Sequence, residues 1–287
     1  MPTQLDLKRR IRSVRNTQQI TRAMKFVAAA RLRRAQERAF AARPYARALS
    51  AVVRSAASRI PETAHPLLQK RPENRALLLV VSGERGLCGA FNANVLRRAV
   101  EFLRGRPAEH APEVMALGRK GRDALRKQRW TMVAEYVDIA ARVQSERAAE
   151  VAKAVTERYK AGEIDAVYIV FNEFKSVLAQ ILTLEKLLPI EPVAPVAAAE
   201  IPVDYIYEQP EGKLLDRLLP RYIEAQVFRA LAESAAAEHA ARMTAMDSAT
   251  NNARELIDKL TLYMNKVRQA AITKEIIEVV SGAASAG

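Results

Sequence analysis

Three glycines in the stretch SGERGLCGAFN are the first residues whose type and spacing could do chemistry. Gly83, Gly86 and Gly89 follow an apolar run and precede a helical pattern, where glycine would let the backbone approach a phosphate. Their spacing is GxxGxxG rather than GxGxxG, and no Lys-Ser/Thr pair completes a phosphate loop. We therefore expect a tight turn in a sheet that has the topology of nucleotide-binding folds without a nucleotide site, and no bound cofactor.

Cys88 lies in the same stretch, at a predicted helix start that would lower the pKa of its thiol. No base is recognisable near it, and cysteine is commonly a small buried residue, so we expect it to pack in the core. The histidines, His65, His110 and His239, are too scattered to form a metal site with it. These histidines, the carboxylates and Trp130 form no acid-base set, so no catalytic or metal-binding residue is assigned.

The charge is strongly uneven along the 287 residues, whose formal net charge is +14. Residues 1–60 contain 13 arginines and two lysines but only Asp6 and Glu37 as acids. Pairing between neighbouring turns of one helix cannot balance this excess, which predicts an acidic partner. The chain starts without a secretory signal and has no membrane-spanning apolar run, so we expect it to reach a membrane only through partners.

The N-terminal 60 residues read as one long helix, because residues 4–60 lack glycine and are rich in Ala, Arg and Leu. Pro44 is the exception and predicts a kink or a local break. Apolar and small residues recur with the 4,3 spacing of a coiled-coil seam. The predicted seam contains Leu7, Ile11, Val14, Gln18, Thr21, Lys25, Ala28, Leu32, Ala35, Ala39, Ala42, Ala46, Leu49, Val53, Ala56 and Ile60.

Residues 73–190 predict a central α/β domain, because apolar strand-like runs alternate with helical patterns. The alternation is typical of a Rossmann-like sheet with helices on its faces, to which a final hairpin adds one strand. The predicted strands are 75–82, 113–117, 130–137, 165–171 and 179–188, and the predicted helices are 90–104, 118–128 and 145–160.

A Pro- and Ala-rich linker or foot segment, residues 191–210, separates this domain from a second long helix within residues 211–287. The sequence thus predicts a helix, an α/β domain and another helix. If both helices leave the domain at one end, they form a long antiparallel two-helix coiled coil. Its C-terminal seam is predicted to contain Ala249, Ala253, Leu256, Leu260, Tyr263, Val267 and Ala270.

Long motifs at both ends resemble the gamma subunit of F-type ATP synthase. They are IRSVRNTQQITRAMKFVAAARLRRAQ (residues 11–36), ARPYA (42–46), the glycine turn, RMTAMDSATNNA (242–253) and NKVRQAAITKEIIEVVSGA (265–283). The resemblance covers nearly the whole chain with the motifs in the family's order. It implies a central rotor shaft that couples proton-driven rotation of the c-ring to conformational changes of the catalytic beta subunits, for ATP synthesis or hydrolysis. The implied partners are the alpha, beta and epsilon subunits and the c-ring, and the chain itself would not be an enzyme.

The same resemblance assigns contact residues. Arg268 and Gln269 match the pair that engages a loop of the beta subunits, while Met24 and Lys25 match the region near an acidic lever segment of those subunits. Such a segment is an acidic partner of the kind that the charge predicts. Independently, the apolar residues around the last turns, such as Ile276, predict that other proteins sheath this helix.

The segment DYIYE resembles the foot of the family's shaft, which implies that Tyr205, Tyr207 and Glu208 contact the c-ring and epsilon. The plastid members' inserted dithiol segment is absent, so we expect no thiol control. Entry from Met1 directly into the first helix favours a bacterial protein at the cytoplasmic face of the cell membrane.

Two other function classes remain open from the residues alone. The basic N-terminal helix would suit a nonspecific nucleic-acid-binding protein, although Phe26, Phe40 and Tyr45 are its only aromatic residues and no recognition module is present. The glycine turn would suit an enzyme built on the α/β domain.

Overall fold

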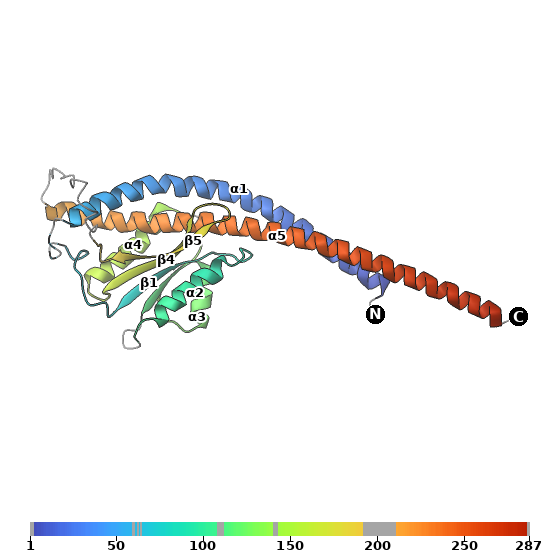
Figure 1. Cartoon of the computed structure of the whole chain (residues 1–287). Coiled ribbons are helices and arrows are strands. Elements are labelled where there is room, and N and C mark those ends of the chain that lie inside the picture. The colour runs from blue at the N-terminus through green and yellow to red at the C-terminus, as the bar shows by residue number, and fades with distance from the viewer. Residues whose placement is uncertain are drawn as a thin grey trace, which may run out of the picture. The chain divides into compact units, whose positions relative to one another are not determined.

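The computed structural model describes residues 3–58, 61, 63, 65–107, 112–139, 143–191 and 211–285, with side chains for all of these except 211 and 282–285. It divides into two units, which we call the coiled-coil unit (Met1–Ala28 with Met243–Gly287) and the sheet unit (Ala29–Arg242). Two long helices, α1 (Gln4–Ala57) and α5 (Glu211–Ser285), contribute to both units (Figure 1).

The sheet unit is built on five strands in the order β3-β2-β1-β4-β5. Neighbouring strands run parallel, except that β5 forms an antiparallel hairpin with β4. Every residue of the central strand β1 is buried, as expected for a parallel strand covered on both faces. The strands are β1 (Ala76–Val81), β2 (Glu113–Leu117), β3 (Met132–Tyr136), β4 (Ala166–Phe174) and β5 (Gln180–Leu188).

Helices cover both faces of this sheet (Figure 1). The helices α2 (Phe91–Arg104) and α3 (Arg119–Lys127) pack on one face, while α4 (Ser145–Lys160) and the first half of α5 lie on the other. The α/β alternation predicted from the sequence is confirmed, with element ends shifted by at most three residues. The core between the sheet and the first pair of helices contains Leu78, Val80, Val95, Ala99, Leu103, Val114, Leu125 and Val170.

The turn after β2 fixes α3 against the end of β1. Gly118 has a φ of +119°, and a Cβ atom there would lie 2.2 Å from the carbonyl oxygen of Ser82. The Ser82 hydroxyl accepts a hydrogen bond of 2.7 Å from the backbone N–H of Gly121. Only glycine at position 118 allows this approach, which seals the carboxyl end of β1 from one side.

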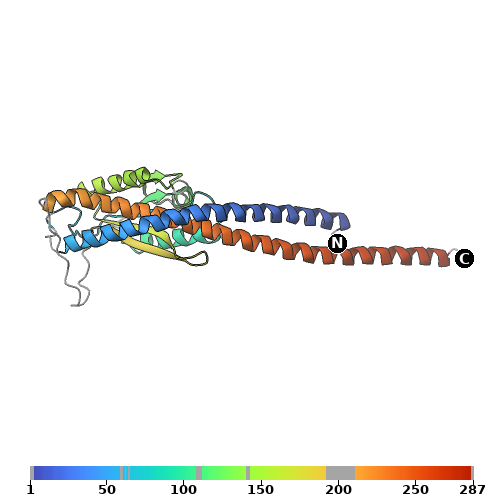
Figure 2. The same cartoon turned by 90° about the horizontal axis from the view of Figure 1, so that it is seen from above.

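In the coiled-coil unit, α1 and α5 pair in antiparallel directions (Figure 2). The hydroxyls of Thr21 and Thr250 share a hydrogen bond of 2.8 Å, and Lys25 Nζ lies 2.6 Å from Asp247 Oδ1. As the residue number rises on α1 it falls on α5, which confirms the predicted antiparallel coil. The seam predicted on α1 is also confirmed, since all its described members are buried or half-buried.

Two sequence predictions about the long helices are wrong. The local break predicted at Pro44 is not found, because α1 continues through the proline to Ala57. The proline removes one backbone hydrogen bond, and the rest of the helix, which is packed along its seam, stays continuous. On α5, Leu256, Tyr263 and Ala270 are exposed, although the predicted seam included them. In the observed seam Ile257 and Met264 take the places predicted for Leu256 and Tyr263, whereas Ala270 has no replacement because Ala271 is exposed as well. The seam contains Met246, Thr250, Ala253, Ile257, Leu260, Met264 and Val267.

In the sheet unit, a buried ion pair joins α1, α5 and the end of β4. Arg43 Nε lies 2.6 Å from Glu233 Oε1, and its Nη2 donates to the backbone carbonyl of Phe174. Glu233 Oε2 in turn accepts from the backbone N–H of Phe174 at 3.0 Å. The side chain of Glu233 is only 1% exposed, so its charge depends on Arg43 for compensation.

We predict that Arg43→Met lowers the free energy of unfolding by about 3 kcal/mol, because it leaves the Glu233 carboxylate buried without its cation. Chemical denaturation of the full chain measures this effect. The control is Arg47→Met, four residues along α1 at an exposed position. In the double variant Arg43→Met/Glu233→Gln, the amide oxygen can still accept from Phe174, and part of the loss should be recovered. Equal effects of Arg43→Met and Arg47→Met would refute the role of the ion pair.

Candidate partner-binding surfaces

Met24 and Lys25 lie on α1 in the coiled-coil unit, where both side chains are half-buried. The ammonium group of Lys25 is already paired with Asp247, and the two side chains are 37% and 48% exposed. An acidic partner at this place would therefore compete with Asp247 or bind beside the pair. The geometry makes Lys25 a part of the coil as well as a candidate contact.

Three apolar residues around this pair were not predicted from the sequence. Ile20, Phe26 and Val27 are 60%, 61% and 53% exposed. They fall between the seam positions of α1. Apolar residues outside the 4,3 spacing cannot pack in the seam, and this pattern in the sequence could have identified them as a contact surface. We call Ile20, Met24, Lys25, Phe26 and Val27 the neck surface.

Arg268 and Gln269 lie on a part of α5 that α1 does not reach. The pairs Thr21–Thr250 and Lys25–Asp247 set the register of the coil. Continued to Gln4, the first residue of α1, this register reaches α5 near Val267. From Arg268 to Ser281 every residue is exposed, and we call this stretch the tip (Figure 2). Arg268 is 21 residues beyond Asp247 on the same helix, which corresponds to roughly 30 Å. The neck surface and the tip are therefore two separate candidate sites.

Apolar side chains distinguish the tip from an ordinary solvent-exposed helix end. Five of its residues are large and apolar, and they are 48–71% exposed. With 3.6 residues per turn their side chains fall on one side of the helix, and an exposed apolar stripe of this kind marks a surface that another protein covers. These residues are Ile272, Ile276, Ile277, Val279 and Val280.

The predicted foot contacts Tyr205, Tyr207 and Glu208 lie outside the described residues, as do His110 and Ile60. In the part of the chain that the structure describes, no helix is both long and apolar enough to span a bilayer. Within the same part, no three His, Cys, Asp or Glu side chains are grouped so that they could hold a metal ion.

The carboxyl ends of β1 and β4 form the place where folds of this topology usually bind a ligand. The chain leaves β1 toward β2 on one side and returns from β3 to β4 on the other, which makes this edge a switch point. Here α5 fills the space. Glu233 accepts from the N–H of Phe174, and the Ser234 hydroxyl accepts from the N–H of Asn172 at 3.1 Å.

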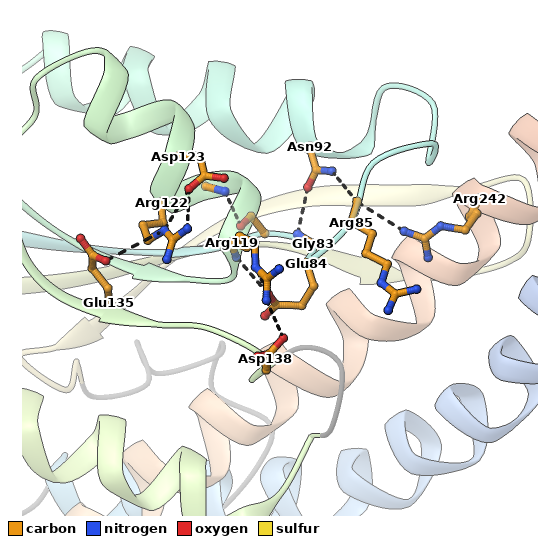
Figure 3. A network of polar contacts seen from close by, with 12 residues as sticks. Gly83, Glu84, Arg85, Asn92, Arg119, Arg122, Asp123, Glu135, Asp138 and Arg242 are labelled. Atoms are coloured by element: carbon orange, nitrogen blue, oxygen red, sulfur yellow. Dashed lines mark hydrogen bonds and ion pairs between the residues drawn. The ribbon is translucent and has the colours of Figure 1, made fainter.

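The glycine turn is shaped by the same helix (Figure 3). A Cβ atom on Gly83 would lie 2.9 Å from the side-chain carboxyl carbon of Glu238, so this glycine admits α5 rather than a phosphate. The Gly83 N–H donates to Asn92 Oδ1 at 2.9 Å, and Arg242 donates to the carbonyl oxygens of Arg85 and Gly86. The tight turn predicted from the sequence is confirmed, with α5 in the position of a ligand.

Cys88 belongs to this turn and is 2% exposed. Burial is the main cause that raises the pKa of its thiol above the ordinary value, the opposite of what a helix start alone would do. Asn92 Nδ2 donates to its sulfur at 3.2 Å. The packing role predicted for Cys88 is confirmed.

Burial also perturbs two groups of α5 beside the turn. The pKa of Glu238 is raised, mainly by burial, although its ion pair with Arg242 opposes the shift. Burial lowers the pKa of His239 to about 4, helped by the nearby cations Arg242 and Arg31. His239 is therefore neutral near pH 7.

We predict that His239 makes the protein sensitive to acid. Its pKa in the folded protein, about 4, lies below the value of about 6.5 expected when the chain is unfolded. Stability is therefore complete above pH 6.5 and is lost as the pH falls toward 4, because only the unfolded chain takes up the proton. Between these values the free energy of unfolding of the wild type should fall by about 1–2 kcal/mol more than that of His239→Gln. Denaturation at several pH values measures the difference, and parallel curves would contradict it.

Comparisons with known proteins give the family of the chain. The ATP synthase family profile matches residues 3–286. The ATP synthase gamma chain of Solibacter usitatus is 55% identical over the full length of both proteins. That of Geobacter metallireducens is 51% identical over 97% of each chain.

Solved structures share the fold at lower identity. A chain from the mitochondrial ATP synthase of Euglena gracilis, in an OSCP/F1/c-ring structure, matches 97% of this chain and 93% of its own length with a TM-score of 0.65 and 19% identity. A chain from the central stalk and c-ring of the Tetrahymena thermophila mitochondrial enzyme matches 80% of this chain and 99% of its own, with a TM-score of 0.61 and 24% identity. The identities to the bacterial proteins and the match over nearly the whole length establish that this chain belongs to the family of ATP synthase gamma chains.

Proposed function

We propose that this chain is the noncatalytic rotating shaft of a bacterial ATP synthase, bound at the cytoplasmic face of the membrane through its partners. The partners are the alpha and beta subunits around the long helices, and the epsilon subunit and c-ring at the foot segment. Membership of the gamma-chain family over nearly the whole length supports this function over the nucleic-acid-binding alternative.

The tip is the observation that carries the proposal. It continues α5 for 14 residues beyond the reach of α1, and each of them is exposed. An isolated helix of this length is only marginally stable in water, and this one also exposes isoleucine and valine side chains. A surrounding sleeve of apolar side chains would stabilise it without fixed polar contacts, which suits a part that must turn.

The coil would transmit torque through two contacts at different heights. Rotation of the c-ring would turn the foot, and the paired helices would carry the rotation to the beta subunits. The neck surface offers Lys25 and exposed apolar groups, while the tip offers Arg268 and Gln269 roughly 30 Å further along α5. Because these surfaces lie on particular faces of the helices, each beta subunit would meet a different face as the shaft turns.

A noncatalytic role is supported by the way in which α5 fills the switch point. Glu233, Ser234 and Glu238 take up the space beside β1 and β4, and carboxylates there would repel a phosphate group. The nucleotide chemistry would then belong entirely to the partner subunits.

We predict that Arg268→Ala/Gln269→Ala lowers the ATPase rate of a complex reconstituted with alpha and beta subunits by about ten-fold, as expected when one charged hydrogen bond to a partner is lost. The matched control is Lys274→Ala/Glu275→Ala, which removes two exposed polar side chains of the same tip. The wild-type chain should co-purify at one copy per three beta subunits. Failure to assemble would refute the proposed function, whereas equal rates for both variants would refute only the contact assignment.

We also predict that Ile276→Asp/Val279→Asp prevents stable assembly while the free chain keeps its unfolding free energy within about 0.5 kcal/mol, because both side chains are already exposed. Gel filtration with the partner subunits measures assembly, and denaturation of the free chain measures stability. Lys274→Asp, which makes the same total change of charge at an exposed position two residues before Ile276, is the control. Normal assembly of the double variant would contradict an apolar sleeve around the tip.

A further inference from the structure

One acidic residue of the coiled-coil unit is isolated among basic ones. Along α1, residues 7–28 contain seven basic residues and no acidic one. Along α5, Asp247 is the only acidic residue of the segment 243–254. Its carboxylate lies 2.6 Å from the ammonium group of Lys25, which belongs to the neck surface. The coil therefore supplies an acidic partner of its own to one cation of this surface.

The pair of Lys25 and Asp247 is open to solvent, unlike the buried pair of Arg43 and Glu233. The side chains of Lys25 and Asp247 are 37% and 48% exposed, whereas the side chain of Glu233 is only 1% exposed. A carboxylate that loses its partner in the interior is left without compensation, but Asp247 is hydrated as soon as Lys25 leaves it. An ion pair of this exposure contributes little to stability and is easily exchanged.

The two helices do not depend on this ion pair to stay together. The hydroxyls of Thr21 and Thr250 share their hydrogen bond of 2.8 Å about one turn away from it. Ala28 and Met246 are buried in the same part of the seam. The ammonium group can therefore leave its carboxylate while the coil remains closed.

The neck surface also exposes apolar side chains that a partner would cover. Phe26, the residue after Lys25, is 61% exposed. A protein that packs against Phe26 removes water from the nearby ammonium group, which then needs a carboxylate at close range. The excess of basic residues on α1 favours a partner that carries such a group. Asp247 and the partner's carboxylate then compete for one cation.

We propose that Lys25 exchanges between Asp247 and an acidic group of the partner, and that Asp247 weakens the partner contact by this competition. The inference rests on the proposed function, in which beta subunits surround the coil. As the shaft turns, Lys25 leaves Asp247 when the neck surface meets a beta subunit and returns to it when the surface moves on. A contact that is made and broken with successive beta subunits must be weak enough to release, and Asp247 provides this.

The test measures how fast the full chain dissociates from a complex with alpha and beta subunits at low ionic strength. Asp247→Asn should dissociate about three-fold more slowly than the wild type, because the amide keeps the shape of the side chain but does not hold Lys25 by charge. Lys25→Gln should dissociate about three-fold faster. Adding Asp247→Asn to Lys25→Gln should change nothing further, because Asp247 acts through Lys25.

The matched control is Asp258→Asn. It removes the same charge from an exposed position of α5, 11 residues beyond Asp247 and thus roughly 16 Å further along the helix. This variant should dissociate at the rate of the wild type. Thermal denaturation of each free chain shows that the variants fold.

Several results would overturn the proposal. Unchanged or faster dissociation of Asp247→Asn would leave Asp247 with a structural role in the coil at most. Equal slowing by Asp247→Asn and Asp258→Asn would assign the effect to net charge. Slowing that persists in the Lys25→Gln background would assign it to direct repulsion between Asp247 and the partner. If the wild type itself does not assemble with alpha and beta subunits, the proposed function fails and this inference fails with it.

Discussion

The buried pair of Arg43 and Glu233 is the interaction on which the rest of the sheet unit depends. Glu233 can be buried because Arg43 neutralises it, and Arg43 reaches it because α1 lies against α5 at this point. The same carboxylate binds the backbone at the end of β4. One ion pair thus fixes two long helices to the edge of a sheet, and it places Ser234, Glu238 and Arg242 further along α5 in the space that other folds of this topology leave for a ligand.

This arrangement explains how a nucleotide-type sheet can serve a mechanical role. Parallel strands with helices on both faces provide a rigid body, and their carboxyl edge provides free backbone groups. In this chain α5 satisfies those groups with its own side chains, so the edge is used for attachment. The glycine turn shows this most clearly, because Gly83 lies against Glu238 of α5 where a ligand would lie in a nucleotide-binding fold.

Much of this fold could be predicted from local patterns. The period of the apolar residues and the positions of glycine and proline gave the strands, the helices and the seam of α1, because each depends on neighbours within one or two turns. The seam of α5 could not be assigned, because Leu256 and Ile257, like Tyr263 and Met264, are adjacent apolar residues and only the partner helix decides between them. Pro44 was misjudged for a similar reason, since the packing of the whole of α1 decides whether one missing backbone hydrogen bond ends the helix.

The candidate sites were predictable to a smaller extent. The motif residues of the neck and tip could be placed on their helices, and Lys25 and Arg268 do lie on accessible faces. The pairing of Lys25 with Asp247, 222 residues away in the sequence, arises only when the chain folds. Such contacts are set by the tertiary structure and leave no local signal.

The pairing of the two chain ends has a consequence for biosynthesis. Thr21 meets Thr250, so the part of α1 in the coiled-coil unit has no partner until the ribosome has completed most of the protein, whereas Arg43 of the same helix can already reach the end of β4. During that time a long, arginine-rich helix with an unmet apolar stripe is exposed in the cell, while the strands and their covering helices can already condense. Contacts between such distant segments also slow the final step, because loop closure must precede any gain from packing. The nascent chain should therefore depend on chaperones or on early capture by its assembly partners more than its helical content alone would indicate.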